Sequence, residues 1–380
     1  MAKLGDIATI QSGGTPSRSV AEYWDNGTIP WVKISDIKSK HLHQTEELIT
    51  DAGLENSSAK VFKKGTILYT IFATLGETSI LDINAATNQA IAGISITDSR
   101  ILSDYLYYYL LSQKNHVQKI GRGVAQNNIN MKLLRDFDVP LPSKDTQLNI
   151  IEQLNRITEL LSLRKQQLAK LDELVKARFV EMFGDPKLNP YNFPCDNLST
   201  YITFLTSGSR GWSQYFTDSG EYFITIKNVK NCKITLQDVQ YVTPPDNAEA
   251  KRTKVQKNDL LISITADLGR TGVVTEEIAN HGAYINQHLT CIRLKNELVH
   301  PLYVAYYMES DAGKEQFTAK NQSAVKAGLN FNAINSLKLI VPPLPLQNQF
   351  AAFVEEVDKS KLLATLFMQN SCILAENRSK

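Results

Sequence analysis

The sequence lacks long apolar runs, a secretion signal and paired cysteines. No run approaches the roughly 18 apolar residues of a membrane-spanning helix, and ILYTIFATLG at residues 67–76 is short enough to be a buried strand. The N-terminal MAKLGDIATI does not place a basic segment before an apolar one, as a secretory signal does. The cysteines, Cys195, Cys232, Cys291 and Cys372, are far apart and have no C-x-x-C spacing. These absences predict a cytoplasmic protein with no membrane partner, zinc site or disulfide framework.

Motifs of known catalytic sites are also missing. There is no G-x-x-x-x-G-K-[ST] loop for the phosphates of ATP, and the GRG at Gly121 lacks the third glycine of a dinucleotide-binding motif. NPYNF at Asn189 is similar to the Asn-Pro-Pro-aromatic loop of amino-methyltransferases, but Tyr191 replaces its second proline. His41 and His43 share a strand face that a metal could use, although surface histidines are more often only polar. We therefore expect no catalytic residue, cofactor or metal on this chain.

Neither sign of charge is in excess. The 41 basic and 39 acidic side chains among 380 residues give a formal net charge of +2. Proteins that bind nucleic acid are often more basic, so the balance neither supports nor excludes DNA as a partner. The length is enough for two domains of ordinary size and an additional element.

The sequence contains one plan in two copies, about two hundred residues apart. KKGTILYTIFATLGETSIL (63–81) corresponds to QKNDLLISITADLGRTGVV (256–274), and TNQAIAGISI (87–96) to INQHLTCIRL (285–294). The tyrosine-rich DYLYYYLLSQ and LYVAYYMESD follow, and then the proline-rich VPLP at Val139 and VPPLP at Val341. Short β-branched segments between Gly, Asn and Asp turns predict strands with few helices. The predicted fold class is therefore α/β (α+β), with two similar globular domains.

Each proline-rich segment precedes a long amphipathic helix. In the first helix, apolar residues at coiled-coil spacing form two rows, interrupted by Arg164 and Arg178: Leu154, Leu161, Leu168, Val175 and Met182, with Ile150, Ile157 and Leu171. Gly184 and Pro186 are expected to end it. The second helix has Phe350, Val357 and Ala364 in one row and Phe353, Phe367 and Leu374 in the other, weakest at Ser360.

Because single helices of this kind need a partner, we expect the two to pack antiparallel as a coiled coil. An approximate two-fold axis would then relate the domains. The predicted boundaries are 1–142 for the first domain, 143–185 for the central helix, 186–345 for the second domain and 346–380 for the C-terminal helix. The helices could merely connect the domains, or they could fix the spacing between them. Paired domains recognise paired DNA half-sites at fixed spacing.

The loops carry side chains suited to DNA. Serine and threonine hydroxyls bind phosphates, arginine and lysine bind guanine, and asparagine and glutamine bind adenine, while glycine permits close approach. The candidate DNA-binding residues are Gly13, Gly14, Thr15, Ser17, Arg18, Lys33, Ser35, Lys38, Arg122, Gln126, Asn127, Ser209, Arg210, Lys227, Asn228, Lys230, Gln322 and Lys326. Tyr107 to Tyr109, Tyr306 and Tyr307 could stack on bases, but their helical context favours core packing.

The chain resembles the specificity subunit of type I restriction–modification systems. The resemblance rests on motifs that occur in the same order in both copies, in the first as SGGTPSR…IPWVKISDI, TNQAI, YLYYYLLSQ and VPLP…Q with a long helix. The second copy departs from this pattern, because TSGSRGW lacks the Thr-Pro and VPPLPLQNQ places the hinge glutamine at Gln349. The resemblance implies two target-recognition domains, each for one half of an asymmetric bipartite DNA site, with the helices setting the spacer.

The resemblance also implies partners. Two methyltransferase subunits would supply S-adenosylmethionine and methylate adenine, and restriction subunits that use ATP and Mg²⁺ are a further class of partner. Leu160, Leu163 and Leu174, outside the helix rows, are the expected docking positions. Two alternatives remain open from the residues alone. One is a coiled-coil scaffold with two protein-binding domains and no DNA recognition, and the other is a self-sufficient DNA enzyme.

Overall fold

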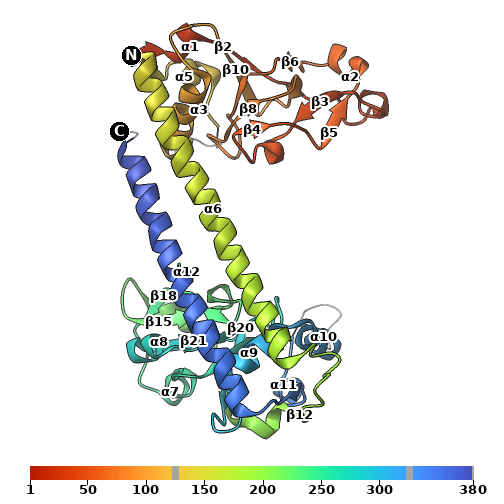
Figure 1. The fold of residues 1–380 in the computed structure, drawn as a ribbon, viewed down its shortest axis with the longest axis vertical. Coiled ribbons are helices and arrows are strands. Elements are labelled where there is room, and N and C mark those ends of the chain that lie inside the picture. The colour runs from red at the N-terminus through yellow and green to blue at the C-terminus, as the bar shows by residue number, and fades with distance from the viewer. Residues whose placement is uncertain (122–127, 322–327, 379–380) are drawn as a thin grey trace. The chain divides into compact units, whose positions relative to one another are not determined.

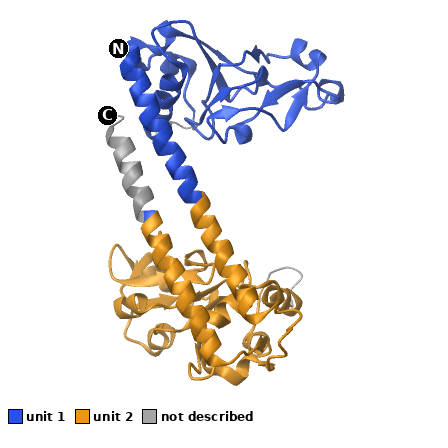
Figure 2. Ribbon diagram, in the orientation of Figure 1, with its two compact units in different colours: residues 1–165, 365–380 blue, residues 166–364 orange. Residues whose placement is uncertain are grey.

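A computed structural model describes the backbone of residues 1–121, 128–321 and 328–378, and side chains as far as Thr365. The chain divides into two compact units (Figure 2): unit 1 comprises residues 1–165 and 365–380, and unit 2 comprises residues 166–364. Each unit is described by itself.

In the described part of unit 1, the strands form two main sheets. The larger has the order β2 (Ala8–Ser12), β10 (Ile91–Ile96), β7 (Ile67–Thr70), β8 (Thr78–Leu81) and β4 (His41–Leu42), antiparallel except for the β4–β8 pair. The smaller has the order β5 (Glu47–Ile49), β3 (Ile29–Val32), β9 (Ala85–Thr87) and β6 (Val61–Phe62), with β3 parallel to β9. A separate pair joins β1 (Ala2–Lys3) to β11 (Asp138–Val139).

The helices of unit 1 are α1 (Leu4–Ile7), α2 (Asp51–Glu55), α3 (Ser103–Ser112), α4 (Lys114–Gly121), α5 (Met131–Arg135) and the first part of α6 (Lys144–Phe183). They pack against the larger sheet, except α2, whose Leu54 packs with Trp31 and Ile49 of the smaller sheet. Leu106 and Leu110 of α3 are fully buried in one cluster with Ile67 and Ile94 of the sheet. Figure 1 shows the smaller sheet on the side of unit 1 away from α6. That sheet and its loops are therefore not covered by the long helix.

Unit 2 repeats this arrangement. Its larger sheet has the order β13 (Ile202–Ser207), β22 (Leu289–Leu294), β19 (Leu260–Ser263) and β20 (Thr271–Val273). Its second sheet has the order β14 (Phe216–Thr217), β18 (Gln240–Val242), β15 (Glu221–Ile224) and β21 (Ala283–Ile285), with β15 parallel to β21. Two pairs join β12 (Cys195–Asn197) to β23 (Lys338–Ile340) and β16 (Val229–Lys230) to β17 (Lys233–Ile234). The helices are α7 (Ala248–Thr253), α8 (Glu276–His281), α9 (Pro301–Glu309), α10 (Asp311–Lys320), α11 (Phe331–Asn335) and α12 (Leu344–Arg378).

The strand orders confirm the internal repeat. The order β2-β10-β7-β8 corresponds to β13-β22-β19-β20, and β5-β3-β9 corresponds to β18-β15-β21. Among the described residues, the second sheet of each unit has one parallel pair, β3 with β9 in unit 1 and β15 with β21 in unit 2. Unit 2 differs in having β14 and in placing α8 between β20 and β21. The predicted α/β fold with two similar domains is therefore confirmed.

The two long helices run antiparallel within unit 2. Phe179 of α6 meets Phe350 of α12 with ring centroids 5.3 Å apart, and Lys361 forms an ion pair with Asp172 further along the pair. Val175 of the predicted α6 rows is buried, as are Phe350, Val357 and Ala364 of the α12 row, while Ser360 is exposed. Phe367 and Leu374 lie beyond the described side chains. Gly184 ends α6 with a positive φ of 75°, as predicted. No helix in the described residues is long and apolar enough to span a membrane.

The hinge before each long helix contains a buried glutamine. Gln147 accepts a hydrogen bond from the backbone N–H of Leu102 (2.9 Å) and donates to the carbonyl oxygen of Pro142 (3.0 Å). In unit 2 the same contacts are made by Gln347, with His300 (2.8 Å) and Pro342 (2.7 Å). The assignment of the second hinge to Gln349 was therefore wrong, and Gln349 is exposed.

The hinge glutamine was assigned wrongly because both proline-rich segments begin with a valine. Matching Val139 to Val341 shifts the comparison by two residues. The strand pairings instead place Val139 opposite Ala2 and Leu339 opposite Asp196, which makes Leu339 the counterpart of Val139. The offset at the hinge is therefore 200 residues, and it is constant along α6 and α12 because both are continuous helices.

Candidate nucleic-acid interface

The candidate residues gather around the second sheet of each unit, where its parallel strands end. We call these segments the edge loops: residues 13–18, 33–38 and 88–90 in unit 1, and 208–212, 225–230 and 286–288 in unit 2. In unit 1 the N–H of Gly14 donates to the Thr87 carbonyl (2.8 Å) and that of Asn88 to the Val32 carbonyl (3.1 Å). In unit 2 the N–H of Asn286 donates to the Ile224 carbonyl (3.2 Å). Backbone bonds thus bring loops that are far apart in sequence to one place in each unit.

A short 3₁₀ turn after the parallel strand exposes two candidate side chains in each unit. In unit 1 the turn Ile34–Asp36 is capped by the Asp36 carboxylate, which accepts from the N–H of Lys33 (2.9 Å). In unit 2 the turn Ile226–Asn228 is capped by the Asn228 side chain, which accepts from the N–H of Thr225 (3.0 Å). The caps leave corresponding positions exposed to solvent, namely Ser35 and Lys38 in unit 1 and Lys227 and Lys230 in unit 2.

Asn228 itself is buried and serves the turn. Its side-chain N–H donates to the carbonyl oxygen of Thr235 (3.1 Å), while its side-chain oxygen holds the turn. Ser209 is also buried, and its hydroxyl accepts a hydrogen bond from the indole N–H of Trp212 (2.7 Å). Neither side chain faces solvent in this structure, and their contact with DNA stays a prediction. Their polar groups are used to shape the loops that carry Arg210 and Lys227, which are exposed.

The glycines of the first loop also have an internal role. A Cβ on Gly13 would lie 2.0 Å from the Thr87 hydroxyl, and one on Gly14 would lie 2.3 Å from the Ser58 hydroxyl. Both glycines are buried, so the close approach that they permit is to the protein's own backbone and side chains rather than to a ligand. The structure therefore shows a packing role for both glycines, and their contact with DNA stays a prediction.

The basic residues of unit 1 differ in their availability. The Lys33 ammonium bonds to Glu46 and Glu47 (2.9 Å each), and these hydrogen bonds raise the pKa of Lys33. Arg18 pairs with Glu47 at 2.6 Å, and its guanidinium lies 3.7 Å from the ring centroid of Trp24. Lys33 thus pairs with two carboxylates, and its contact with DNA stays a prediction. The Arg18 side chain is still 54% exposed.

Two hydroxyls of the first loop lie near solvent. Thr15 donates to the side-chain oxygen of Gln89 (2.5 Å), and Ser17 is exposed, with its hydroxyl 2.9 Å from that of Ser19. The contact of Thr15 identifies Gln89 as a residue that the sequence reasoning missed. Gln287 occupies the corresponding place in unit 2, where its amide nitrogen lies 3.0 Å from the His288 ring. The Asn-Gln pair that occurs in both copies, in TNQ and INQ, was the available signal.

Five predicted residues lie outside the described residues, namely Arg122, Gln126, Asn127, Gln322 and Lys326.

The tyrosines are better placed for packing than for stacking on bases. Tyr107 and Tyr307 are buried, and burial raises the pKa of each to about 12. Core packing is therefore confirmed for these two.

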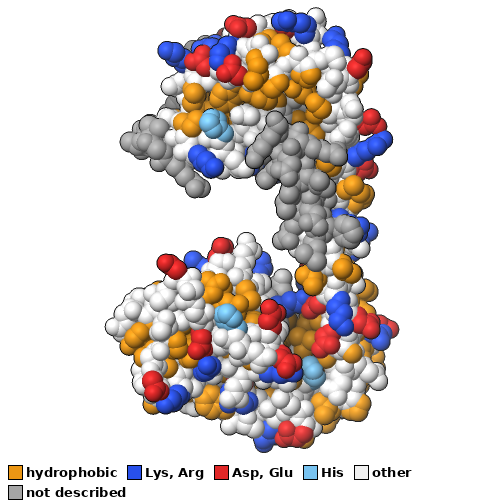
Figure 3. Space-filling model, turned by 90° about the vertical axis from the view of Figure 1, so that its left-hand side faces the viewer, with side chains coloured by type: hydrophobic (Ala, Val, Ile, Leu, Met, Phe, Trp, Pro, Cys, Tyr) orange, Lys and Arg blue, Asp and Glu red, His pale blue; other side chains and the backbone are white. Residues whose placement is uncertain are grey.

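Charge and apolar surface are mixed. Figure 3 shows basic and acidic side chains interspersed over the visible face of each unit. In the part of the chain that the structure describes, no group of three or more His, Cys, Asp or Glu residues could hold a metal ion.

Leu160, Leu163 and Leu174 of α6 are exposed, as are Leu362 and Leu363 of α12, which the sequence reasoning missed. Leu363 stands 200 residues after Leu163, so both long helices present an exposed leucine at the same place in the repeat.

The family model described as the type I restriction modification DNA specificity domain matches residues 1–173 and 213–366. The MjaIX specificity subunit of Methanocaldococcus jannaschii is 29% identical over 188 residues, which cover 48% of this chain and 43% of the relative. The EcoprrI specificity subunit of Escherichia coli is 21% identical over 370 residues, covering 93% of this chain and 86% of the relative. The match to the first of these thus spans less than half of that relative.

Two solved structures share the fold. The S subunit of a type I restriction–modification system from M. genitalium has a TM-score of 0.53 and 16% identity, covering 100% of this chain and 94% of that chain. A chain solved in work on complex assembly and conformational transition of the type I R-M system has a TM-score of 0.62 and 16% identity, covering 100% and 95%.

Proposed function

Because this chain belongs to the family of type I restriction–modification DNA specificity domains, we propose that it is the DNA-recognition subunit of such a system, with each unit recognising one half of a bipartite site. The observation that carries this proposal is the repeated framework with different edge loops. The strand orders match, but the exposed positions carry Ser35 and Lys38 in one unit and Lys227 and Lys230 in the other. One framework with two sets of exposed side chains suits two different half-sites.

Among the described residues, those that face solvent from the edge loops are the best candidates for DNA contacts. In unit 1 they are Ser17, Arg18, Ser35, Lys38 and Gln89, with Thr15 beside Gln89; in unit 2 they are Arg210, Lys227 and Lys230, with the half-buried Gln287 in the place of Gln89. Lysine and arginine suit phosphates and guanine, and the two glutamine amides suit adenine. The scaffold without DNA recognition is not favoured, because the family is defined by DNA specificity.

The catalytic steps are assigned to partners. Two methyltransferase subunits would bind S-adenosylmethionine and methylate adenine, and restriction subunits that join the complex would use ATP and Mg²⁺. This chain would contribute no catalytic residue and no cofactor site, as the lack of catalytic motifs suggests. The exposed leucines Leu163 and Leu363 are at equivalent places in the repeat, which supports two equivalent docking positions for two copies of one partner.

The proposal is tested by mapping adenine methylation in cells that express this chain with its methyltransferase partner. A split motif is expected. Replacing residues 195–340 with those of a relative that recognises another sequence should change one half of the motif and leave the other half unchanged. A continuous motif, or one that is indifferent to the replacement, would overturn the proposal.

Single substitutions then locate the contacts. Lys227→Ala and Lys230→Ala together should weaken binding to a duplex that contains the motif and reduce its dependence on salt, since each lysine that binds a phosphate adds about one unit to the salt slope. Lys144→Ala is the matched control, because Lys144 is exposed on α6 and lies outside the edge loops. Equal salt slopes for the double variant and the control would remove these lysines from the interface.

A further inference from the structure

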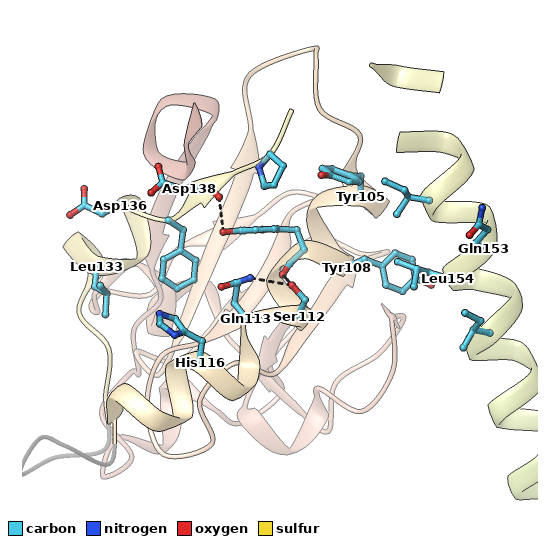
Figure 4. Close-up of a pocket in the computed structure, with 15 residues that line it drawn as sticks. Tyr105, Tyr108, Ser112, Gln113, His116, Leu133, Asp136, Asp138, Gln153 and Leu154 are labelled. Atoms are coloured by element: carbon cyan, nitrogen blue, oxygen red, sulfur yellow. Dashed lines mark hydrogen bonds between the residues drawn. The ribbon is translucent and has the colours of Figure 1, made fainter. Parts of the chain in front are cut away.

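Polar and aromatic side chains gather at two places in unit 1. One is a pocket of about 680 Å³ between α3 and the first turns of α6, where Tyr108 faces Leu154 (Figure 4). None of its described lining residues belongs to an edge loop. The other place surrounds Arg18, at the end of the first edge loop, where DNA recognition requires side chains that distinguish one base from another.

Arg18 is held in one orientation by an ion pair and an aromatic ring. Its guanidinium lies 2.6 Å from a carboxylate oxygen of Glu47 and 3.7 Å from the ring centroid of Trp24. The Trp24 indole N–H donates to the carbonyl oxygen of Ser17 (3.1 Å), so the ring is bound to the same loop. A guanidinium stacked on an aromatic face keeps N–H groups available at the edge of its plane. Because the Arg18 side chain is 54% exposed, those groups can reach a ligand.

Glu47 remains ionised beside Arg18. One of its carboxylate oxygens accepts a hydrogen bond from the Lys33 ammonium (2.9 Å), and the other faces Arg18. Burial opposes ionisation, but the contacts with Lys33 and Arg18 outweigh it and hold the pKa of Glu47 below its ordinary value. The neighbouring Glu46 also pairs with Lys33 (2.9 Å). Two carboxylates thus balance the charges of two basic side chains.

Unit 2 does not repeat this arrangement. The strand registers place Trp31 opposite Glu47 in unit 1 and Phe223 opposite Gln240 in unit 2. A neutral amide therefore has the place of the Glu47 carboxylate. Arg210, in the matching edge loop, is exposed. The ion pair at Arg18 is thus a feature of unit 1 and not of the shared framework.

An arginine with a carboxylate partner suits the edge of a base better than a phosphate. A phosphate bound to Arg18 would also lie near the negative charge of Glu47, and like charges at such distances repel each other. The edge of a guanine has no net charge and offers two acceptors, O6 and N7, that match the fork of arginine N–H groups. Holding the guanidinium in place also reduces the side-chain freedom that is lost on binding.

We propose that Arg18 recognises a guanine in the half-site of unit 1, and that Glu47 and Trp24 are positioning residues that orient its guanidinium. This role rests on the proposed function and extends it by naming one base and the side chains that select it. Since Gln240 replaces the carboxylate in unit 2, the role is confined to one half of the motif.

Selection from a library of duplexes with randomised bases provides the test. The complex of the full chain with its methyltransferase partner binds the library, and sequencing of the bound duplexes gives the base preference at each position. The half of the motif that belongs to unit 1 is the half that stays unchanged when residues 195–340 are replaced. We expect one G·C base pair in that half to depend on Arg18.

Arg18→Lys separates base recognition from phosphate binding, because lysine keeps the charge but not the planar fork. It should reduce the preference for that guanine at least about fivefold, the lower end of what a bidentate contact contributes to discrimination. Arg18 is exposed, so this variant keeps the test valid if a change at Glu47 unfolds unit 1. Base preferences that are unchanged in Arg18→Lys would overturn the proposal.

Glu47→Gln tests the positioning role. It should relax the preference at the same base pair as Arg18→Lys and leave the other half of the motif unchanged. Glu46→Gln is the matched control, because it removes the same charge from the adjacent residue, whose ion pair among the described residues is with Lys33. The control should leave all base preferences unchanged. Equal effects of the two variants, or a loss that is spread over all base pairs, would overturn the proposal.

The wild-type complex separates this proposal from the proposed function. If it selects no base at any position, both are wrong. If it selects a split motif whose unit 1 half responds to neither Arg18→Lys nor Glu47→Gln, the proposed function stands and the role of Arg18 and Glu47 is wrong.

Discussion

The same pair of neighbouring strands is joined differently in the two units. In unit 1 the hydroxyls of Thr66 and Ser95 lie 3.2 Å apart between β7 and β10. In unit 2 the corresponding residues are Asp259 and Arg293, whose side chains form two bonds of 2.8 and 2.9 Å between β19 and β22. The backbone register is shared, because Ile67 pairs with Ile94 as Leu260 pairs with Ile292.

At this position the repeat preserves the backbone pairing and the need for a polar partner, but not the residue type. A neutral pair and an ion pair both satisfy the position. The same holds for the turns that carry the edge loops, where Asp36 and Asn228 form the same cap. Differences between the units are therefore expected mainly in stability and in exposed side chains, and both can be measured.

The largest expected effect is in unit 2, where the rings of Phe179, Phe183, Tyr303 and Phe350 pack together. Phe183→Ala removes a buried ring that contacts Tyr303, Phe350 and Phe179. The expected loss is about 3–5 kcal/mol in the free energy of unfolding of unit 2, as for other buried aromatic truncations. Hydrogen exchange, followed by mass spectrometry, should show faster exchange in α9 than in the wild type. Exchange in α3 of unit 1 is the internal control, and equal acceleration in both helices would contradict the comparison.

The next effect concerns the ion pair. Asp259→Ala should destabilise unit 2 by about 3 kcal/mol, the lower end for breaking a buried pair, because the Arg293 side chain is 30% exposed and retains contact with water. Thr66→Ala should cost only about 1 kcal/mol, the usual value for one neutral hydrogen bond. Chemical denaturation measures both.

The double variant Asp259→Thr with Arg293→Ser sharpens this test, since it transfers the solution of unit 1 into unit 2. It should be more stable than Asp259→Ala alone, because no unpaired charge is left. A double variant that is less stable would show that the strands of unit 2 need the ion pair for more than a satisfied polar contact.

A smaller effect is expected at the two hinges, where the units are alike. Gln147→Ala and Gln347→Ala each remove a buried amide that bonds to the start of α3 or α9. Each should cost about 1–3 kcal/mol, the range for leaving buried backbone groups without partners. Gln349→Ala is the control and should change the free energy of unfolding little, because Gln349 is exposed. Strongly different losses for Gln147 and Gln347 would break the equivalence of the two hinges.

Much of the fold could be predicted from the sequence because periodicity and repetition are direct consequences of geometry. The row of Phe350, Val357 and Ala364 follows from the spacing of a packed helix, and these residues are buried. The hinge register could not be predicted, because Val139 and Val341 look alike and only strand pairing distinguishes them from true counterparts.

The candidate site was less predictable for a related reason. Residue type does not tell whether a polar side chain faces solvent or the protein's own backbone. Lys33 and Asn228 have the chemistry of DNA contacts, but Lys33 bonds to two carboxylates and Asn228 caps a turn. Gln89 was missed because a glutamine between two strands also fits an ordinary turn, so the Asn-Gln pair shared by the two copies was used only to align them.

The smallest predicted effect depends on pH. His300 caps α9 by accepting a hydrogen bond from the N–H of Leu302 (3.2 Å), and burial lowers its pKa below the ordinary 6.5. Its counterpart in unit 1, Leu102, cannot titrate. Because the pKa in the folded chain is lowered, the stabilisation by neutral His300 is fully present above 6.5 and is lost as the pH falls through the lower folded value.

Acidification should therefore weaken α9 more than α3. After correction for intrinsic exchange rates, hydrogen exchange between about pH 7.5 and about pH 5 should show a larger loss of protection in α9, in the pH range where a lowered histidine pKa titrates. His300→Asn keeps a good helix cap but cannot titrate, so it should remove the difference between the helices while preserving protection at neutral pH. If α9 of His300→Asn responds to acid as the wild type does, carboxylates near α9, such as Glu355, and not His300, account for the response of unit 2.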